Sequence, residues 1–193
     1  MSTCVRVPLF LDLRGRAVVV VGGGAVAASK VEALLRAGAR VHLIAPEIRA
    51  QIERPGITLS RRGFVPSDLD GAWLAVGAAT PEVNQQVARA AEERQVWLNA
   101  VDDPSAASAF AGGVLEKGGV TIAVSTSGEA PALAGLLREA LEAVIPDEIE
   151  GWIARARQER RRWRADGVPF GRRRPLLLQA LNRLYEARTE PSR

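Results

Sequence analysis

The sequence contains one cysteine and one histidine among its 193 residues. Cys4 has no partner for a disulfide within the chain, and so few thiol and imidazole ligands exclude a closed cysteine–histidine metal site. We therefore predict no resident metal. Both shortages suit a reducing compartment, and we predict a cytoplasmic protein.

Long apolar runs are also missing. The longest, from Ala17 to Ala28, is too short to span a bilayer and contains three glycines. Arg6 and Asp12 interrupt the apolar residues at the start of the chain, where a signal peptide would need a basic start and an unbroken apolar segment. We expect neither a leader nor a membrane partner.

Lysine is rare as well: Lys30 and Lys117 are the only two, so 24 of the 26 basic residues are arginine, and the net charge is +4. Many arginines lie in the last third of the chain. Guanidinium groups bind carboxylates and phosphates bidentately, which would suit a polyanionic ligand, although a solvated helix face explains the charge equally well. No nucleic-acid motif accompanies these arginines, and we predict no nucleic-acid partner.

Apolar strands and amphipathic helices alternate through the first half of the chain. This alternation predicts an α/β fold, a Rossmann-like doubly wound parallel sheet. The expected strands are Ala17–Val21, Arg40–Ala45, Ile57–Ser60, Trp73–Ala78 and Val96–Leu98, and the expected helices are Ala25–Ala37 and Pro81–Glu93.

The pattern changes after Pro104. Residues 108–115 and 120–125 predict a β-hairpin, 127–144 predict an amphipathic helix, and 147–164 and 175–187 predict two terminal helices. We divide the chain into an NAD-binding Rossmann domain (1–112), a dimerisation module of hairpin and helix (113–145) and an arginine-rich helical region (146–193).

A glycine motif of the form G-x-G-x-x-A lies between the first strand and the first helix. In Gly22-Gly23-Gly24-Ala25-Val26-Ala27, the first glycine allows a tight turn and the third lets the backbone approach a pyrophosphate. The free N–H groups at the start of the following helix attract phosphates. In this setting the motif predicts a dinucleotide site, with Pro46 and Glu47 at the end of the second strand placed to meet the adenosine ribose. NAD is favoured over NADP.

Two further segments carry polar groups for which the residues alone leave two interpretations open. Asp102 and Asp103 follow the strand that ends near Asn99, so they are candidates for proton transfer or for capping a turn. Ser125 and Thr126 precede a helix and fit either an anion site or an N-cap. His42 has no companion ligand and is interpreted as a structural residue.

From about Val7 to Leu141 the sequence resembles the precorrin-2 dehydrogenase family, the N-terminal part of siroheme synthases. The resemblance rests on the glycine motif together with several shorter motifs in the same order. These are Ala78-Ala79-Thr80, Val83-Asn84, Asn99-Ala100-Val101-Asp102-Asp103-Pro104, Thr121-Ile122-Ala123-Val124-Ser125-Thr126, Pro131-Ala132-Leu133-Ala134 and Leu136-Leu137-Arg138-Glu139.

The resemblance implies NAD⁺ as hydride acceptor, precorrin-2 as substrate, sirohydrochlorin as product and a homodimer. It assigns the functional carboxylate to Asp102, which in bifunctional members also takes part in inserting Fe²⁺. The residues that it implies at the cofactor are Gly22, Gly23, Gly24, Ala25, Val26, Pro46, Glu47 and Thr80. Those that we expect at the substrate are Asn99, Ser125, Thr126 and Arg138; the position of Thr126 is a serine that can be phosphorylated in some relatives.

The sequence departs from the family pattern at several positions near the expected substrate. Phe110-Ala111-Gly112-Gly113 stands where Phe-x-x-Pro-Ala is common, and Gly135 stands where arginine is common. We also find no methyltransferase domain, so we expect the chain not to make precorrin-2 itself. The alternative function is a non-catalytic NAD-sensing module, which would need the glycine motif but not Asp102.

Overall fold

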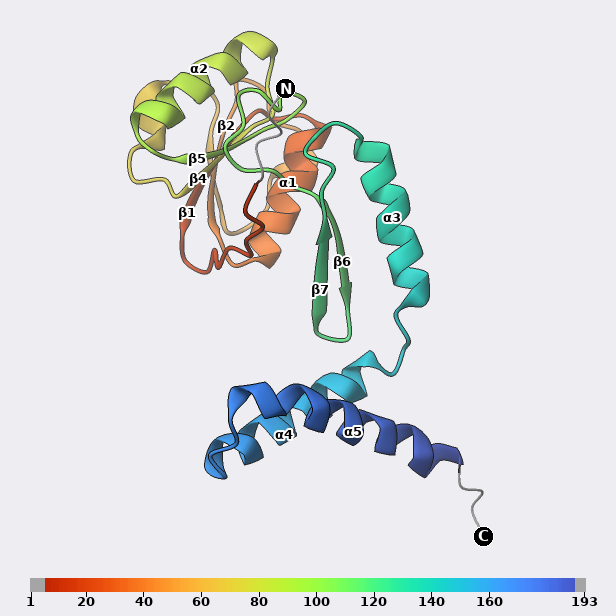
Figure 1. Ribbon diagram of the computed structural model, residues 1–193. Helices are drawn as coiled ribbons and strands as arrows, with labels where there is room; N and C mark the ends of the chain where they lie inside the picture. The colour runs from red at the N-terminus through yellow and green to blue at the C-terminus, as the bar shows by residue number, and fades with distance from the viewer. Residues whose placement is uncertain (1–5, 190–193) are drawn as a thin grey trace. The chain divides into compact units, whose positions relative to one another are not determined.

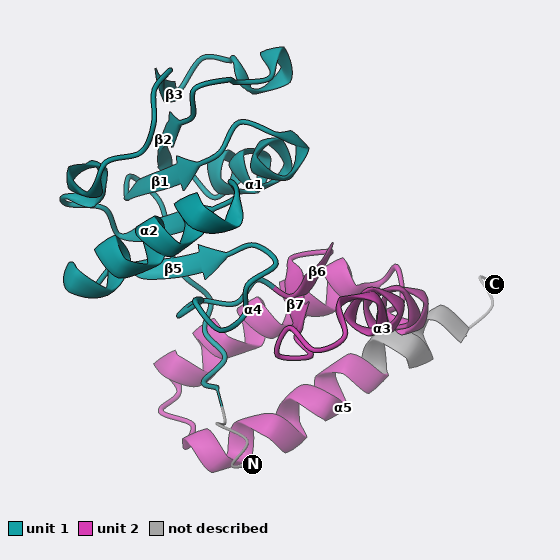
Figure 2. Ribbon diagram, turned by 90° about the horizontal axis from the view of Figure 1, so that it is seen from above, with its two compact units in different colours: residues 1–111 teal, residues 112–193 magenta. Residues whose placement is uncertain are grey.

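A computed structural model describes residues 6–189, and for residues 183–189 the backbone alone. Cys4 lies outside the described residues. The chain forms two compact units, Met1–Ala111 and Gly112–Arg193 (Figure 2). The further division of the second unit into a dimerisation module and a helical region stays a prediction.

The first unit is built on a five-stranded sheet in which every neighbouring pair of strands is parallel (Figure 1). The order β3-β2-β1-β4-β5 places the first strand in the middle. Strands β2 and β3 are added on one side of β1, and the chain then crosses back to add β4 and β5 on the other side. The predicted doubly wound sheet is therefore confirmed. The strands are β1 (Ala17–Val21), β2 (Arg40–Ile44), β3 (Ile57–Ser60), β4 (Leu74–Gly77) and β5 (Trp97–Ala100).

Helices α1 (Ala25–Arg36) and α2 (Pro81–Glu93) cover opposite faces of this sheet. Alternate residues of a strand point to opposite faces, so β1 contributes to both cores: Val18 and Val20 pack with Val31 of α1, and Val19 packs with Val87 of α2. Each such valine is buried, which stabilises the fold by roughly 1.5–3 kcal/mol relative to exposure. Two 3-10 turns, η1 (Ala50–Ile52) and η2 (Pro66–Leu69), complete the unit.

The second unit contains a β-hairpin of β6 (Gly113–Lys117) and β7 (Val120–Val124), with helix α3 (Pro131–Val144) packed on it. Leu115 and Ala134 are buried at this contact. Helices α4 (Ile149–Ala165) and α5 (Phe170–Thr189) pack against each other. At the hairpin turn, Lys117 Nζ donates to the Ile145 carbonyl at 2.7 Å and pairs with Asp147.

Three predicted boundaries in this part of the chain were wrong. The first hairpin strand begins at 113 because Ser108 and Ala109 instead donate their N–H groups to the Leu98 carbonyl at the edge of β5. Helix α3 begins at 131 because Ser127 (φ 59°) and Gly128 (φ 83°) adopt left-handed conformations that a helix cannot contain. Helix α5 begins at 170, one turn ahead of Pro175.

Within residues 6–189, none of the helices combines the length and the apolar composition that a membrane-spanning helix requires.

Candidate active site

The glycine motif turns sharply between β1 and α1 at the centre of the sheet. Gly22 has φ 126°, and a Cβ atom there would collide with the carbonyl of Ala78. A Cβ atom on Gly23 would collide with the carbonyl of Glu47, because the Arg49 N–H donates to the Gly23 carbonyl at 3.1 Å and holds this loop close. The first two glycines are therefore required by the packing of the protein itself.

Gly24 is different, because nothing in the protein lies within 4 Å of the place where its Cβ would be. It is the N-cap of α1, with no side-chain cap and no acidic residue in the first turn. Exposed Ala25 and Val26 follow it. The third glycine thus leaves open space beside a helix N-terminus, which is the arrangement that admits a pyrophosphate.

A hollow of about 350 Å³ adjoins this loop at the carboxyl ends of β4 and β5. Its walls come from α1, the two strand ends and the start of α2, all within the first unit. The lining residues are Val26, Ala78, Ala79, Pro81, Asn84, Val101, Asp102 and Asp103. Because the strand order reverses between β1 and β4, the hollow lies where doubly wound sheets bind ligands.

Asn84 shapes one wall of this hollow. Its side chain is buried, and its Oδ1 accepts the Ala79 N–H at 3.1 Å. The bond fixes the turn between β4 and α2 that carries Thr80. Sequence reasoning gave Asn84 no role at the site, although a polar residue on the buried face of a predicted helix was the available signal.

The two aspartates differ in their surroundings. Asp103 Oδ1 accepts the Ser105 hydroxyl at 2.6 Å and the N–H groups of Ser105 and Ala106. These bonds, the Ser105 hydroxyl first, hold the pKa of the Asp103 carboxyl below its ordinary value. Asp102 is exposed, has φ 59° and makes no hydrogen bond or ion pair with the described residues. Asp103 caps the turn, and the Asp102 carboxylate is the one left available to a ligand.

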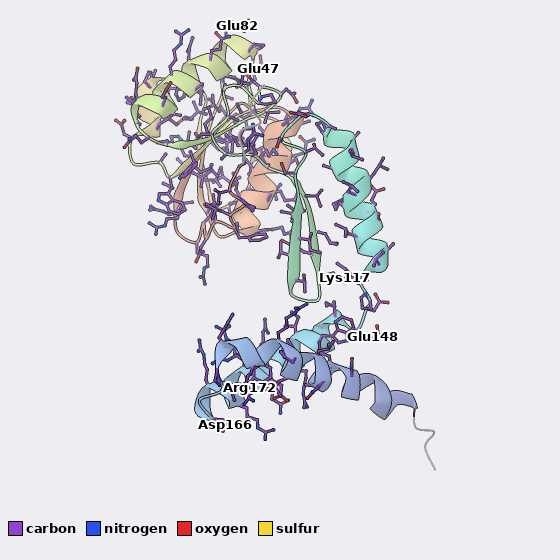
Figure 3. All side chains as sticks on the ribbon, in the orientation of Figure 1. Glu47, Glu82, Lys117, Glu148, Asp166 and Arg172 are labelled. Atoms are coloured by element: carbon purple, nitrogen blue, oxygen red, sulfur yellow. The ribbon has the colours of Figure 1, made fainter. Side chains whose placement is uncertain are left out.

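The remaining predicted cofactor residues lie at the same end of the sheet. Pro46 and Glu47 are exposed directly after β2, and Thr80 is the N-cap of α2. Figure 3 shows Glu47 and Glu82 at this end of the first unit. The backbone N–H of Glu82 and the Thr80 hydroxyl hold the pKa of the Glu82 carboxyl below its ordinary value.

Four predicted substrate residues are engaged in local bonds. Asn99 Nδ2 donates to the Ala109 carbonyl at 3.0 Å. In the second unit, Ser125 Oγ accepts the Ser127 N–H, and Thr126 Oγ1 accepts the Ala130 N–H ahead of α3. Arg138 pairs with Glu142 and Glu139 of its own helix. Their substrate roles stay predictions.

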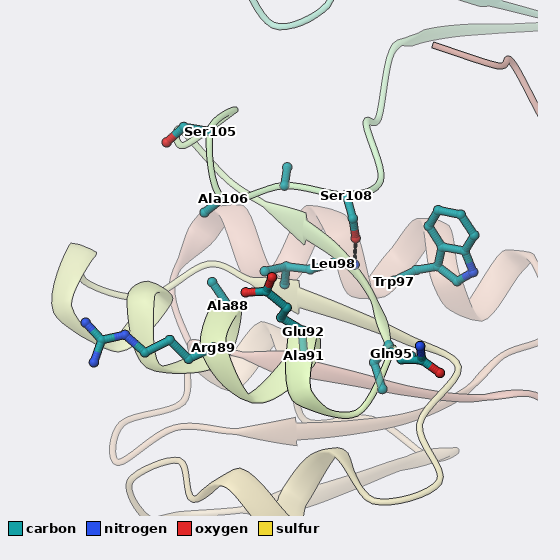
Figure 4. Close-up of a pocket in the computed structure, with 12 residues that line it drawn as sticks. Ala88, Arg89, Ala91, Glu92, Gln95, Trp97, Leu98, Ser105, Ala106 and Ser108 are labelled. Atoms are coloured by element: carbon teal, nitrogen blue, oxygen red, sulfur yellow. Dashed lines mark hydrogen bonds between the residues drawn. The ribbon is translucent and has the colours of Figure 1, made fainter. Parts of the chain in front are cut away.

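A second hollow, of about 470 Å³, is lined by α2, β5 and the loop of residues 105–108 (Figure 4). Trp97, Glu92 and Ser108 are among its lining residues, and the glycine motif contributes none. Among the described residues, no group of three or more His, Cys, Asp or Glu side chains could hold a metal ion.

Comparison with known proteins identifies the first unit. Residues 9–113 match the family model described as "Putative NAD(P)-binding", which covers more than half of the chain. The chain belongs to this family. Residues 117–143 match a second model, described as the central part of sirohaem biosynthesis proteins.

The curated relatives are siroheme synthases. The chain is 38% identical over 172 residues to siroheme synthase 1 of Aeromonas hydrophila, an alignment that covers 86% of this chain and 37% of the relative. It is 41% identical over 155 residues to siroheme synthase 2 of Klebsiella pneumoniae, covering 78% of this chain and 34% of the relative. The chain thus spans little more than a third of the length of these proteins.

Among solved structures, SirC, described as a precorrin-2 dehydrogenase, matches with a TM-score of 0.74 at 24% identity. The match covers 90% of this chain and 88% of that one. It shows that the fold of this chain is a known one.

Proposed function

We propose that the protein is an NAD-dependent dehydrogenase that oxidises precorrin-2 to sirohydrochlorin. The observation that carries the proposal is Asp102, an exposed carboxylate that has no partner among the described residues and lines the same hollow as Val26 of the glycine motif. The siroheme synthase relatives and the sirohaem model over residues 117–143 support the substrate class.

The residues of the first unit fit the parts of a nicotinamide dinucleotide. The open backbone at Gly24 and the start of α1 would hold the pyrophosphate, and Glu47 would accept hydrogen bonds from the ribose hydroxyls. When bound, the dinucleotide supplies the acceptor for a hydride. Dehydrogenation also releases a proton, and the carboxylate of Asp102, which lines the hollow, would accept it and pass it to solvent.

The decisive experiment is anaerobic incubation of the full chain with precorrin-2 and NAD⁺, followed by the absorbance of NADH and of sirohydrochlorin. Stoichiometric formation of both supports the dehydrogenase. Tight NAD⁺ binding without turnover would contradict it and favour the NAD-sensing alternative. The reducing cytoplasm, which contains NAD⁺, is the compartment that we propose for this reaction.

The proposed substrate carries eight carboxylates, and α4 presents a row of arginines suited to them. Arg157, Arg160, Arg161 and Arg164 recur at positions i, i+3, i+4 and i+7, so they share one face of the helix. All are exposed and make no ion pair within the described residues. Figure 3 shows Asp166 and Arg172 at the turn to α5. Asp166 pairs with Arg162, which is not one of these four arginines. Like charges at this spacing destabilise a helix, so a polyanionic ligand would relieve the repulsion.

We predict that Arg160→Gln/Arg164→Gln raises the KM for precorrin-2 by about three- to tenfold, as expected for the loss of two exposed ion pairs. Higher salt should diminish the difference between this variant and the wild type. The control is Arg54→Gln/Arg89→Gln, which removes the same charge from exposed positions of the first unit. Equal KM values in the two variants would contradict the role of the α4 arginines in binding the substrate.

We also propose that the protein is a homodimer, with α3 in the interface. Five large apolar side chains on one side of this helix are exposed: Leu133, Leu136, Leu137, Leu141 and Val144. Exposed apolar surface of this extent on one helix is typical of a protein–protein contact. A second copy of the chain would present the same surface in return.

We predict that Leu136→Glu/Val144→Glu converts the dimer to a monomer, because both side chains are more than 60% exposed and a dimer would bury the new charges. Sedimentation equilibrium measures the mass. The matched control is Gly135→Glu, where a side chain meets no atom within 4 Å and points to the polar side of α3. A monomeric wild type, or a double variant that stays dimeric, contradicts the proposal.

A further inference from the structure

Two arginines follow β3 at the edge of the sheet where the adenosine half of a dinucleotide would bind. The Ala45 N–H donates to the Ser60 carbonyl at 3.1 Å, which brings the end of β3 beside the end of β2. Arg61 and Arg62 come directly after Ser60, and Pro46 and Glu47 come directly after Ala45. The two arginines therefore flank the segment that would meet the ribose.

Both guanidinium groups are held by carboxylates of the same unit. Arg61 Nη2 lies 2.7 Å from Glu53 Oε1, just beyond η1. Arg62 forms a bidentate pair with Asp68, at 2.6 and 2.8 Å, and also donates to the Gly63 carbonyl. Arg62 holds the pKa of the Asp68 carboxyl below its ordinary value, and the Asp68 side chain is only 5% exposed.

The two pairs differ in how readily they could open. The Arg62 pair is anchored, because Asp68 also accepts the Val65 N–H at 2.9 Å. The Arg61–Glu53 pair is exposed, with 49% and 42% of the two side chains accessible, and neither side chain makes another hydrogen bond within residues 6–182. Glu53 is thus the group that decides whether the Arg61 guanidinium is free.

The charge on this guanidinium bears on the choice of cofactor. NADP differs from NAD by a 2′-phosphate on the adenosine ribose, which arginine binds, whereas a carboxylate such as Glu47 binds the free 2′-hydroxyl. Glu47 is exposed and has no partner within the described residues, so it remains available.

We propose that Glu53 is a specificity-determining residue, which holds Arg61 in an ion pair and thereby withholds it from the 2′-phosphate of NADP⁺. With Arg61 and Arg62 both paired to carboxylates, Glu47 and the exposed Arg49 are the charges left in the segment after β2, and the Glu47 carboxylate favours the free 2′-hydroxyl of NAD⁺. This inference rests on the proposed use of a nicotinamide dinucleotide but not on the identity of the oxidised substrate.

The test compares dissociation constants for NAD⁺ and NADP⁺, measured by calorimetry on the full chain without precorrin-2. Glu53→Gln keeps the size of the side chain and frees the Arg61 charge, and we expect it to lower the Kd for NADP⁺ by about five- to tenfold, the gain of one charge-assisted hydrogen bond at an exposed site. The Kd for NAD⁺ should change less than about twofold by the same reasoning.

Two controls make the result specific. Glu53→Gln/Arg61→Gln should return the Kd for NADP⁺ to the wild-type value. Glu32→Gln removes the same charge from an exposed position of α1 and should leave both constants unchanged. An unaltered NADP⁺ affinity in Glu53→Gln, or an equal gain in Glu32→Gln or in the double variant, overturns the role of Glu53. A wild type that binds NAD⁺ in these runs keeps the proposed function intact; one that binds neither dinucleotide refutes both proposals.

Discussion

Replacing Asp102 by asparagine is expected to lower kcat for precorrin-2 oxidation by about 10²- to 10⁴-fold, the usual contribution of a positioned acid or base. Asparagine tolerates the left-handed backbone found at this position, so the turn should keep its conformation. The amide cannot accept the proton at neutral pH. Steady-state kinetics under anaerobic conditions measures the effect, with the affinity for NAD⁺ expected to stay at the wild-type value.

Asp103→Asn is the matched control for this substitution. Asp103 accepts three hydrogen bonds that cap the turn, so the neutral amide should lower the melting temperature and leave much of kcat intact. Because those bonds depress the pKa of Asp103, its contribution to stability is present above the pKa of the unfolded chain and is lost as the pH falls through the folded value. Comparable kcat losses in both variants would remove the distinction between the two aspartates.

Replacing Gly24 by aspartate is expected to abolish cofactor binding without weakening the fold. The new side chain meets no atom within 4 Å, the backbone is extended, and aspartate is a favoured N-cap residue. Its charge would stand where the pyrophosphate must approach. Losing one or two phosphate contacts of about 1.5–3 kcal/mol each raises the Kd for NAD⁺ by about 10-fold to about 10⁴-fold.

Two comparisons show whether Gly24 acts as proposed. Gly24→Asn has the same size without the charge and should weaken NAD⁺ binding less than aspartate does. Gly22→Ala should instead lower the melting temperature, because its Cβ would collide with the Ala78 carbonyl and its φ of 126° is strained for alanine. If Gly24→Asp binds NAD⁺ normally, the pyrophosphate does not lie at this N-terminus.

The sequence predicted the sheet because each strand carries its signal locally. The apolar run Val18–Val21 predicts a strand buried on both faces, and the structure shows those residues divided between two cores. A predicted boundary was wrong where a residue bonds to a part of the chain that is distant in sequence. Ser108 was assigned to the hairpin but bonds to Leu98, a partner that no local pattern identifies.

The sequence by itself determined the doubly wound fold and the glycine turn, since these depend on periodicity, residue size and neighbours along the chain. Only the tertiary structure decided which carboxylate is free, because Asp102 and Asp103 are adjacent in sequence and differ in their backbone angles and hydrogen bonds. It alone showed that Arg61 is paired with Glu53, because side chains eight residues apart meet only when the chain folds back between η1 and β3. The contribution of each charge at this site depends on such contacts.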